Sequence, residues 1–165
     1  MTLQVSTGHG QDELALLTET VRLAADNVAR GGGPFGALVA RNGEVLAVGS
    51  NQVTPTLDPT AHAEVVAIRG ACRRLGDFRL TGCVLVTSCE PCPLCLSAAL
   101  WARVDRVLYA ADRHDAAAAG FDDLAFHRLF ETPRETWSVR VEQIDHAERT
   151  APFAAWLARP DRTKY

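Results

Sequence analysis

The sequence predicts an α/β protein with three layers, in which helices cover both faces of a mixed, mostly parallel five-stranded sheet. Three observations predict this class. Short apolar runs alternate with segments of helical periodicity, two early runs flank an Asn-Gly turn, and turn-rich segments separate the elements. Strands that alternate with helices need crossover connections, which favour parallel pairing, and the hairpin then extends the sheet at one edge.

The first predicted elements are a helix and a hairpin. Residues 12–30 carry apolar side chains at three- and four-residue steps, Asp12 is a candidate N-cap, and a glycine run ends the helix. Residues 37–40 and 45–48 are predicted to be two strands. The two-residue turn Asn42-Gly43 joins them, a sequence typical of a tight hairpin.

The remaining predicted elements alternate between helix and strand. Helical spacing predicts a helix over residues 61–75 that ends at Gly76. Residues 83–86 form an apolar run typical of a buried strand, residues 93–102 a helix that leaves its end, and residues 104–110 another strand. Further on, residues 151–158 form a short amphipathic segment.

Composition and charge limit the possible classes of protein. With 165 residues, 47% of them hydrophobic and 22% charged, we expect one globular domain over residues 1–165, with residues 1–11 as a flexible tail. A net charge of −3 without a dense basic run argues against nucleic acid as a partner. Neither a long apolar run nor a signal-peptide pattern is present, so we expect a cytoplasmic protein that does not interact with a membrane.

Cysteine usage points to a metal. Five cysteines is an odd number, and three of them lie within seven residues, which suits metal or thiol chemistry better than disulfides. His62, Cys92 and Cys95 supply one imidazole and two thiolates. A structural zinc site takes four protein ligands, whereas a catalytic zinc keeps one position for water, so three ligands favour catalytic Zn²⁺. Cys89 is expected to be a packing residue.

Glu64 completes a recognisable pattern. It lies two residues after His62, too close in the sequence to join the same tetrahedron but able to reach water at the metal. The combination of H-x-E with P-C-x-x-C matches the signature of zinc-dependent nucleobase deaminases, in which this Glu is the general acid/base. A redox pair or half of a zinc ribbon would explain a C-x-x-C alone. Neither explains His62 and Glu64, and no C-x-x-C lies outside residues 89–95.

Further segments extend the match beyond the zinc pattern. They are residues 32–37, Asn51, residues 58–64, 87–92, 101–103 and 119–123, and, near the end of the chain, Pro152, Phe153, Trp156 and Tyr165. On these residues the sequence resembles the cytidine-deaminase-like superfamily and, within it, the small guanine deaminases of the bacterial type. The resemblance runs from about Ala24 to the last residue.

The resemblance implies a metal site and two catalytic carboxylates. His62, Cys92 and Cys95 would bind zinc, and Glu64 would be the general acid/base. Asp123 would act as a second polar group near the departing amine. An Asp that follows a loop is also a common helix cap, and from the residues alone this reading of Asp123 stays open.

The resemblance also implies five substrate-binding residues. Asn51 would hydrogen-bond the purine edge, Phe35 and Trp101 would contact the plane of the base, Ala63 would belong to the same site, and Tyr165 would close the pocket. From the residues alone, Asn51 could instead cap its own turn, and the two aromatic side chains could belong to the core.

The end of the chain is expected to close the active site. The segment 151–165 is apolar enough to need a partner surface. In the family that the sequence resembles, such a segment packs across a dimer and is sometimes exchanged between subunits. We therefore expect a homodimer, in which Tyr165 reaches either its own site or that of the neighbour.

The expected reaction is hydrolytic deamination of guanine to xanthine and ammonia. Alternatives are another free ring or nucleoside (guanosine, cytosine or a triazine), tRNA adenosine, or a zinc module without catalysis. Low net charge disfavours tRNA, and Glu64 disfavours a module without catalysis. Three departures from the family pattern, at Leu57, Leu94 and Ser97, are expected to reshape the pocket.

Overall fold

The computed structural model describes residues 8–164, which divide into two compact units. The first extends to Arg128, and the second begins at Leu129. The single domain expected over residues 1–165 stays a prediction. No helix within the described residues is long and apolar enough to span a membrane.

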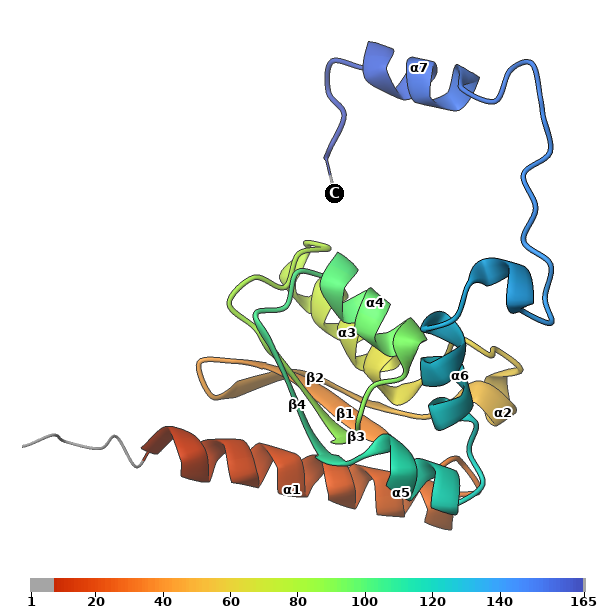
Figure 1. Ribbon diagram of the computed structural model, residues 1–165. Coiled ribbons are helices and arrows are strands. Elements are labelled where there is room, and N and C mark those ends of the chain that lie inside the picture. Colours follow the sequence, from red (N-terminus) through yellow and green to blue (C-terminus); the bar gives the residue numbers. More distant parts are fainter. Residues whose placement is uncertain (1–7, 165) are drawn as a thin grey trace, which may run out of the picture. The chain divides into compact units, whose positions relative to one another are not determined.

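The first unit has three layers (Figure 1), as predicted. Helix α1 (Gly8–Ala29) covers one face of the sheet, and helices α3 (Ala63–Leu75) and α4 (Pro93–Trp101) cover the other. Three short helices complete the unit: α2 (Val53–Thr56), α5 (Arg113–Ala118) and α6 (Asp123–Phe130), the last of which extends into the second unit. Because α1 begins at Gly8, residues 8–11 belong to a helix and not to the expected tail, whose first seven residues lie outside the described part.

The sheet has four strands in the described residues, one fewer than predicted. They are β1 (Gly36–Arg41), β2 (Glu44–Ser50), β3 (Val84–Cys89) and β4 (Arg106–Ala111), in the spatial order β2-β1-β3-β4. The hairpin lies at one edge, as predicted. After β4 the described chain forms only helices, turns and irregular segments, so no fifth strand joins the sheet there.

The prediction of mostly parallel pairing is wrong, although the strands joined by crossovers do run in the same direction, as expected. Only β3 and β4 pair in parallel, whereas β1 pairs antiparallel with both β2 and β3. The two crossovers make β2, β3 and β4 run in one direction. Strand β1 runs the other way and lies between β2 and β3, which makes two of the three pairings antiparallel. Local sequence defines the direction of each crossover but not which strands become neighbours.

The hairpin turn has the predicted conformation. Asn42 and Gly43 both have positive φ, 52° and 81°, as a two-residue hairpin turn of the favoured type requires. Two glycines then let helices approach the hairpin closely. A Cβ at Gly36 would lie 2.5 Å from the Thr20 carbonyl oxygen of α1, and one at Gly49 would lie 2.2 Å from the Ala63 carbonyl oxygen of α3. The start of α3 is thereby held against β2.

The core lies on both faces of β1. Ala37 and Val39 pack in a cluster with residues of α3 and α4, whereas Leu38 and Ala40 pack toward α1. The alternation follows from the period of two in a strand. Since both faces of β1 and β3 are buried, these strands are a rigid base for the segments that leave their ends.

The second unit contains a 3-10 turn (Arg134–Thr136) and α7 (Ala151–Ala158), a helix over the residues of the short amphipathic segment 151–158. The Phe130 and Trp137 rings pack edge to face, with their centroids 5.1 Å apart. Several of its large apolar side chains are exposed: Phe130, Val139, Val141, Ile144, Phe153 and Leu157. Apart from Phe130, which packs on Trp137, these side chains present apolar surface to solvent.

Candidate metal centre and substrate pocket

Two helix N-termini bring the predicted zinc ligands together. His62 is the N-cap of α3 and Cys92 the N-cap of α4, both with extended backbone. Cys95 lies one turn into α4, and Pro93, which needs no hydrogen-bond acceptor at the first helical position, starts that helix. The three ligand atoms lie within 4.8 Å of one another.

The distances between the donors fit zinc. The Nδ1 atom of His62 lies 3.6 Å from the Sγ of Cys92 and 3.4 Å from the Sγ of Cys95. A tetrahedral zinc with usual Zn–S and Zn–N bond lengths separates its sulfur and nitrogen ligands by about 3.5 Å. One imidazole and two thiols are also a donor set that zinc prefers. The three side chains therefore have the chemistry and the spacing of a zinc site that leaves one coordination position free of protein.

The thiols share a hydrogen bond that separates their pKa values. Hydrogen bonds from Cys95 and from the His62 ring lower the pKa of Cys92 to about 4. The same contact, together with burial, raises the pKa of Cys95. The hydrogen bond to Cys92 also raises the pKa of His62. The lowered pKa of Cys92 favours its thiolate, the form in which cysteine binds zinc.

Glu64 lies in the first turn of α3, beside the zinc donors. Its side chain is 5% exposed and lines the pocket. One carboxylate oxygen lies 3.3 Å from the Sγ of Cys95, and the other accepts a hydrogen bond of 3.4 Å from the Thr87 hydroxyl of β3. Burial raises the pKa of Glu64, because water no longer solvates its charge. A buried carboxyl group with a raised pKa is suited to accept and release a proton during a reaction.

The predicted site residues Phe35, Asn51 and Asp123 line the same cavity as His62, Glu64 and Cys92. This cavity has a volume of about 280 Å³. The side-chain oxygen of Asn51 accepts the Val53 N–H at 3.2 Å, so Asn51 caps its own turn and also faces the pocket. The capping role is confirmed for Asn51, and its hydrogen bond to a purine edge stays a prediction.

Asp123 is the first residue of α6 and is half-buried in the pocket. Burial raises the pKa of its carboxyl group. Next to it, the Phe35 ring meets the Phe121 ring edge to face, with the centroids 4.8 Å apart and the planes at 80°. Phe121 therefore braces Phe35, which leaves the Phe35 ring on the cavity wall.

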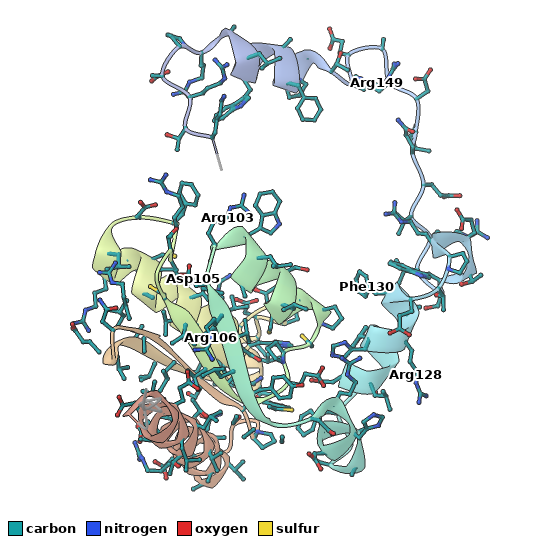
Figure 2. The ribbon with its side chains drawn as sticks, turned by 60° about the vertical axis from the view of Figure 1, so that its left-hand side comes forward. Arg103, Asp105, Arg106, Arg128, Phe130 and Arg149 are labelled. Carbon is teal, nitrogen blue, oxygen red and sulfur yellow. The ribbon has the colours of Figure 1, made fainter. Side chains whose placement is uncertain are left out.

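Two predicted substrate-binding residues, Trp101 and Ala63, are not among the residues that line the cavity, and a third cannot be placed. Trp101 is the last residue of α4, about 13 Å along the helix axis from Cys92. It is 58% exposed, does not line the cavity, and lies under Arg103, whose guanidinium carbon is 5.7 Å from its ring centroid. Figure 2 shows Arg103 just beyond that end of α4. Ala63 is fully buried against β2, so only its backbone could serve a ligand. Tyr165 lies outside the described residues.

Sequence reasoning missed several residues of the pocket wall. They are Gly33, Val53, Thr54, Glu90, Phe121 and Phe126. Glu90 directly follows β3, and its carboxylate accepts from Arg113 Nε at 2.9 Å and from a second guanidinium nitrogen, which lowers the pKa of Glu90. The position of Glu90 at the end of a buried strand was a signal that could have identified it. The predicted packing residue Cys89 is buried, with its pKa raised to about 11, and is not part of the donor cluster.

Leu57, Leu94 and Ser97, the three departures from the family pattern, do not line the cavity. Leu57 is 90% exposed, and Leu94 and Ser97 are exposed on α4. None of the three side chains therefore shapes the cavity by direct contact, contrary to expectation.

The sequence profile of the cytidine and deoxycytidylate deaminase zinc-binding region matches residues 11–111, which include all three zinc donors and Glu64. The chain belongs to this family of zinc-binding deaminases. Zinc is accordingly its cofactor, and His62, Cys92 and Cys95 are positioned to bind it.

Within this deaminase family, the chain is similar to guanine deaminase of Bacillus subtilis, with 47% identity over 150 residues, 90% of this chain and 96% of that protein. The crystal structure of guanine deaminase from Bacillus subtilis superposes with a TM-score of 0.88, at 46% identity, over 92% of this chain and 97% of that one. A tRNA-specific adenosine deaminase of Aquifex aeolicus is 36% identical over 110 residues, 66% of this chain and 73% of that protein.

Proposed function

We propose that this chain catalyses hydrolytic deamination of guanine to xanthine and ammonia. The observation that carries the proposal is a single cavity that holds a zinc donor set, a buried carboxyl group and a flat aromatic wall. Similarity to a guanine deaminase over nearly the whole chain supports guanine as the ring. The similarity to the tRNA-specific enzyme covers a smaller part of the chain and is weaker.

In the proposed reaction, one water molecule replaces the amino group. The C2–O bond forms, the bond between C2 and the amino nitrogen breaks, and the nitrogen leaves as ammonia. Zinc, when bound, supplies a Lewis acid that activates the attacking water. Glu64 accepts a proton from this water and passes it on toward the ring and the departing amine, for which its raised pKa suits it.

The other pocket residues bind and orient the ring in this proposal. Phe35 stacks on the purine plane and is kept in place by Phe121. The Asn51 carboxamide hydrogen-bonds the purine edge, because its amide hydrogens are free of partners among the described residues. Asp123, whose pKa is raised by burial, is the second polar group near the departing amine. The Ala63 N–H, in the first turn of α3, is a further donor toward the ring.

We test the proposal by measuring ammonia release from the zinc-loaded protein. The panel contains guanine, guanosine, adenine, cytosine, cytidine and ammeline, with Glu64→Ala as the control. Guanine as the best substrate, with Glu64→Ala inactive, supports the proposal. Preference for another ring contradicts guanine as the substrate, and equal activity of Glu64→Ala contradicts the role of Glu64.

We propose further that the protein is a homodimer in which the C-terminal segment 151–165, with Tyr165, closes an active site. The apolar side chains that are exposed on the second unit and on α4 support this, since exposed apolar surface is typical of protein interfaces. Trp101 would then serve the dimer and not the cavity wall. Sedimentation velocity at several concentrations tests the dimer, and a monomer at all of them contradicts it.

A cytoplasmic location stays a prediction of the sequence. It is supported by the five cysteines, all of which are free thiols in the structure. Free thiols persist in a reducing compartment. Fractionation of cells that express the protein would test the location.

A further inference from the structure

Asn27 lies near the end of α1, on the opposite face of the sheet from α3 and α4, yet it is only 4% exposed. Its side-chain Nδ2 donates hydrogen bonds to two backbone oxygens, at 2.8 Å to Gly33 and at 3.0 Å to Asn51. An amide nitrogen carries two hydrogens, so both are used. Because both partners are carbonyl oxygens, only the NH₂ group of the carboxamide can face them.

The two acceptors belong to the segments that carry the proposed ring-binding side chains. The Phe35 N–H donates to the Gly33 oxygen at 2.9 Å, and the Asn51 N–H donates to the Phe35 oxygen at 3.1 Å. Together with the two bonds from Asn27, these contacts form a closed ring of four hydrogen bonds. The Asn27 side chain thereby ties the backbone at Phe35 to the backbone at Asn51.

Space around the carboxamide is tight. A Cβ at Gly32 would lie 2.3 Å from the Asn27 Nδ2, so glycine is required there. The Asn27 carbonyl accepts the Gly32 N–H at 2.9 Å, which ends α1 beside its own side chain. The carboxamide is therefore held in one position from two sides.

We propose that Asn27 is a positioning residue that keeps Phe35 and Asn51 at a set separation and thereby determines the affinity of the pocket for its ring substrate. The inference rests on the proposed function for the identity of that ring. Asn27 does not line the cavity, so its effect passes through the two segments and not through contact with substrate. The zinc donors and Glu64 lie on other helices, so the chemical step is spared.

The test compares Asn27→Asp with Thr20→Val. Asn27→Asp keeps the size of the side chain but places oxygens opposite two carbonyl oxygens, which pushes the segments apart. We expect KM for guanine to rise about tenfold or more with kcat changed less than about threefold, the pattern of lost ground-state binding. Thr20 is a matched control, because it is fully buried on α1 and its hydroxyl bonds only Leu17 of the same helix, at 2.7 Å. We expect Thr20→Val to leave KM unchanged.

Hydrogen exchange of the amides in residues 33–35 and 51–53, without substrate, is a second measurement. We expect faster exchange in both segments for Asn27→Asp and not for Thr20→Val. An unchanged KM in Asn27→Asp, or an equal rise in Thr20→Val, overturns the inference. If Asn27→Asp does not fold, Asn27→Ser, which keeps one donor, takes its place, and an unchanged KM there overturns it as well.

The two proposals fail in different ways. If the wild-type protein releases no ammonia from guanine, the proposed function fails, whereas exchange in the two segments still decides whether Asn27 holds them. If the wild-type protein deaminates guanine and Asn27→Asp does so with the same KM, only the positioning role fails.

Discussion

The pocket has two sides that are built in different ways, a metal corner and a ring wall. The metal corner comprises His62, Glu64, Cys92 and Cys95, and the ring wall comprises Phe35, Asn51, Phe121 and Asp123. The corner comes from the first turns of two helices, in pairs of residues only two or three positions apart. The wall comes from three separate segments: Phe35 precedes β1, Asn51 follows β2, and Phe121 and Asp123 lie at the start of α6.

This difference predicts different consequences of substitution. Short spacing at a helix start places the two corner side chains of each helix relative to each other, and these side chains bind metal or move a proton directly, so a change there removes metal or proton transfer outright. The wall depends on ring packing and hydrogen bonds between distant segments, so a change of Phe35, Asn51 or Phe121 alters affinity by smaller factors, whereas Asp123, the titratable residue of the wall, acts on kcat. The following tests run from the largest expected effect to the smallest.

Cys92→Ser should remove zinc and lower kcat/KM by at least about 1,000-fold, because a hydroxyl is a poor zinc ligand. Serine is a good N-cap, so α4 should still form. Metal analysis and ammonia release measure the two effects. Cys89→Ser is the control, since Cys89 is also buried but lies outside the donor cluster. Full zinc content in Cys92→Ser would contradict the ligand assignment.

Glu64→Gln should lower kcat by roughly 100- to 10,000-fold while zinc stays bound, because the amide cannot accept the proton. Steady-state kinetics with parallel metal analysis distinguishes this loss from that of Cys92→Ser. A variant within tenfold of wild-type kcat would remove Glu64 from the mechanism and would make the metal the sole essential part of the corner.

Asp123→Asn should lower kcat by about 100-fold. At higher pH the same substitution should raise the stability of the folded protein relative to wild type. Burial raises the pKa of Asp123 in the folded protein, so its contribution to stability is present below its unfolded pKa, about 4, and is lost as pH rises through the folded value. The variant does not titrate. Its melting temperature relative to wild type should therefore increase from pH 4 to pH 8. A difference that falls with pH would show that a partner stabilises the charged form.

Phe121→Leu should raise KM for guanine by about three- to tenfold, since the edge-to-face contact with Phe35 is worth about 0.5–1.5 kcal/mol. The zinc content and kcat should change little. Phe78→Leu is the control, because Phe78 is similarly exposed and does not line the cavity. An equal rise of KM in both variants would mean that general packing, and not the brace on Phe35, sets affinity.

Most helices, the hairpin and the four strands that were predicted one by one are present, with ends that differ by a few residues. The prediction of mostly parallel pairing was wrong because β1 lies between β2 and β3. A tight turn joins β1 to β2, whereas β3 follows β2 after a crossover, so β1 runs antiparallel to both. Sequence period shows which strand is buried on both faces, but neighbouring strands are chosen by long-range packing.

The sequence by itself determined the metal corner. Cys92 and Cys95 follow as a pair from chain spacing, because a helix start aligns residues three apart and exposes N–H groups that favour a thiolate, and the H-x-E pattern adds His62 and Glu64. The packing of α3 beside α4 then brings His62 to the two cysteines. The tertiary structure alone decided the ring wall: it brought Phe121 onto Phe35, placed Glu90 in the cavity, left Trp101 outside it, and put Asn27 beneath two segments. These contacts join residues that are far apart in the chain. Whether such residues meet depends on how the helices pack on the sheet, and no local sequence pattern predicts it.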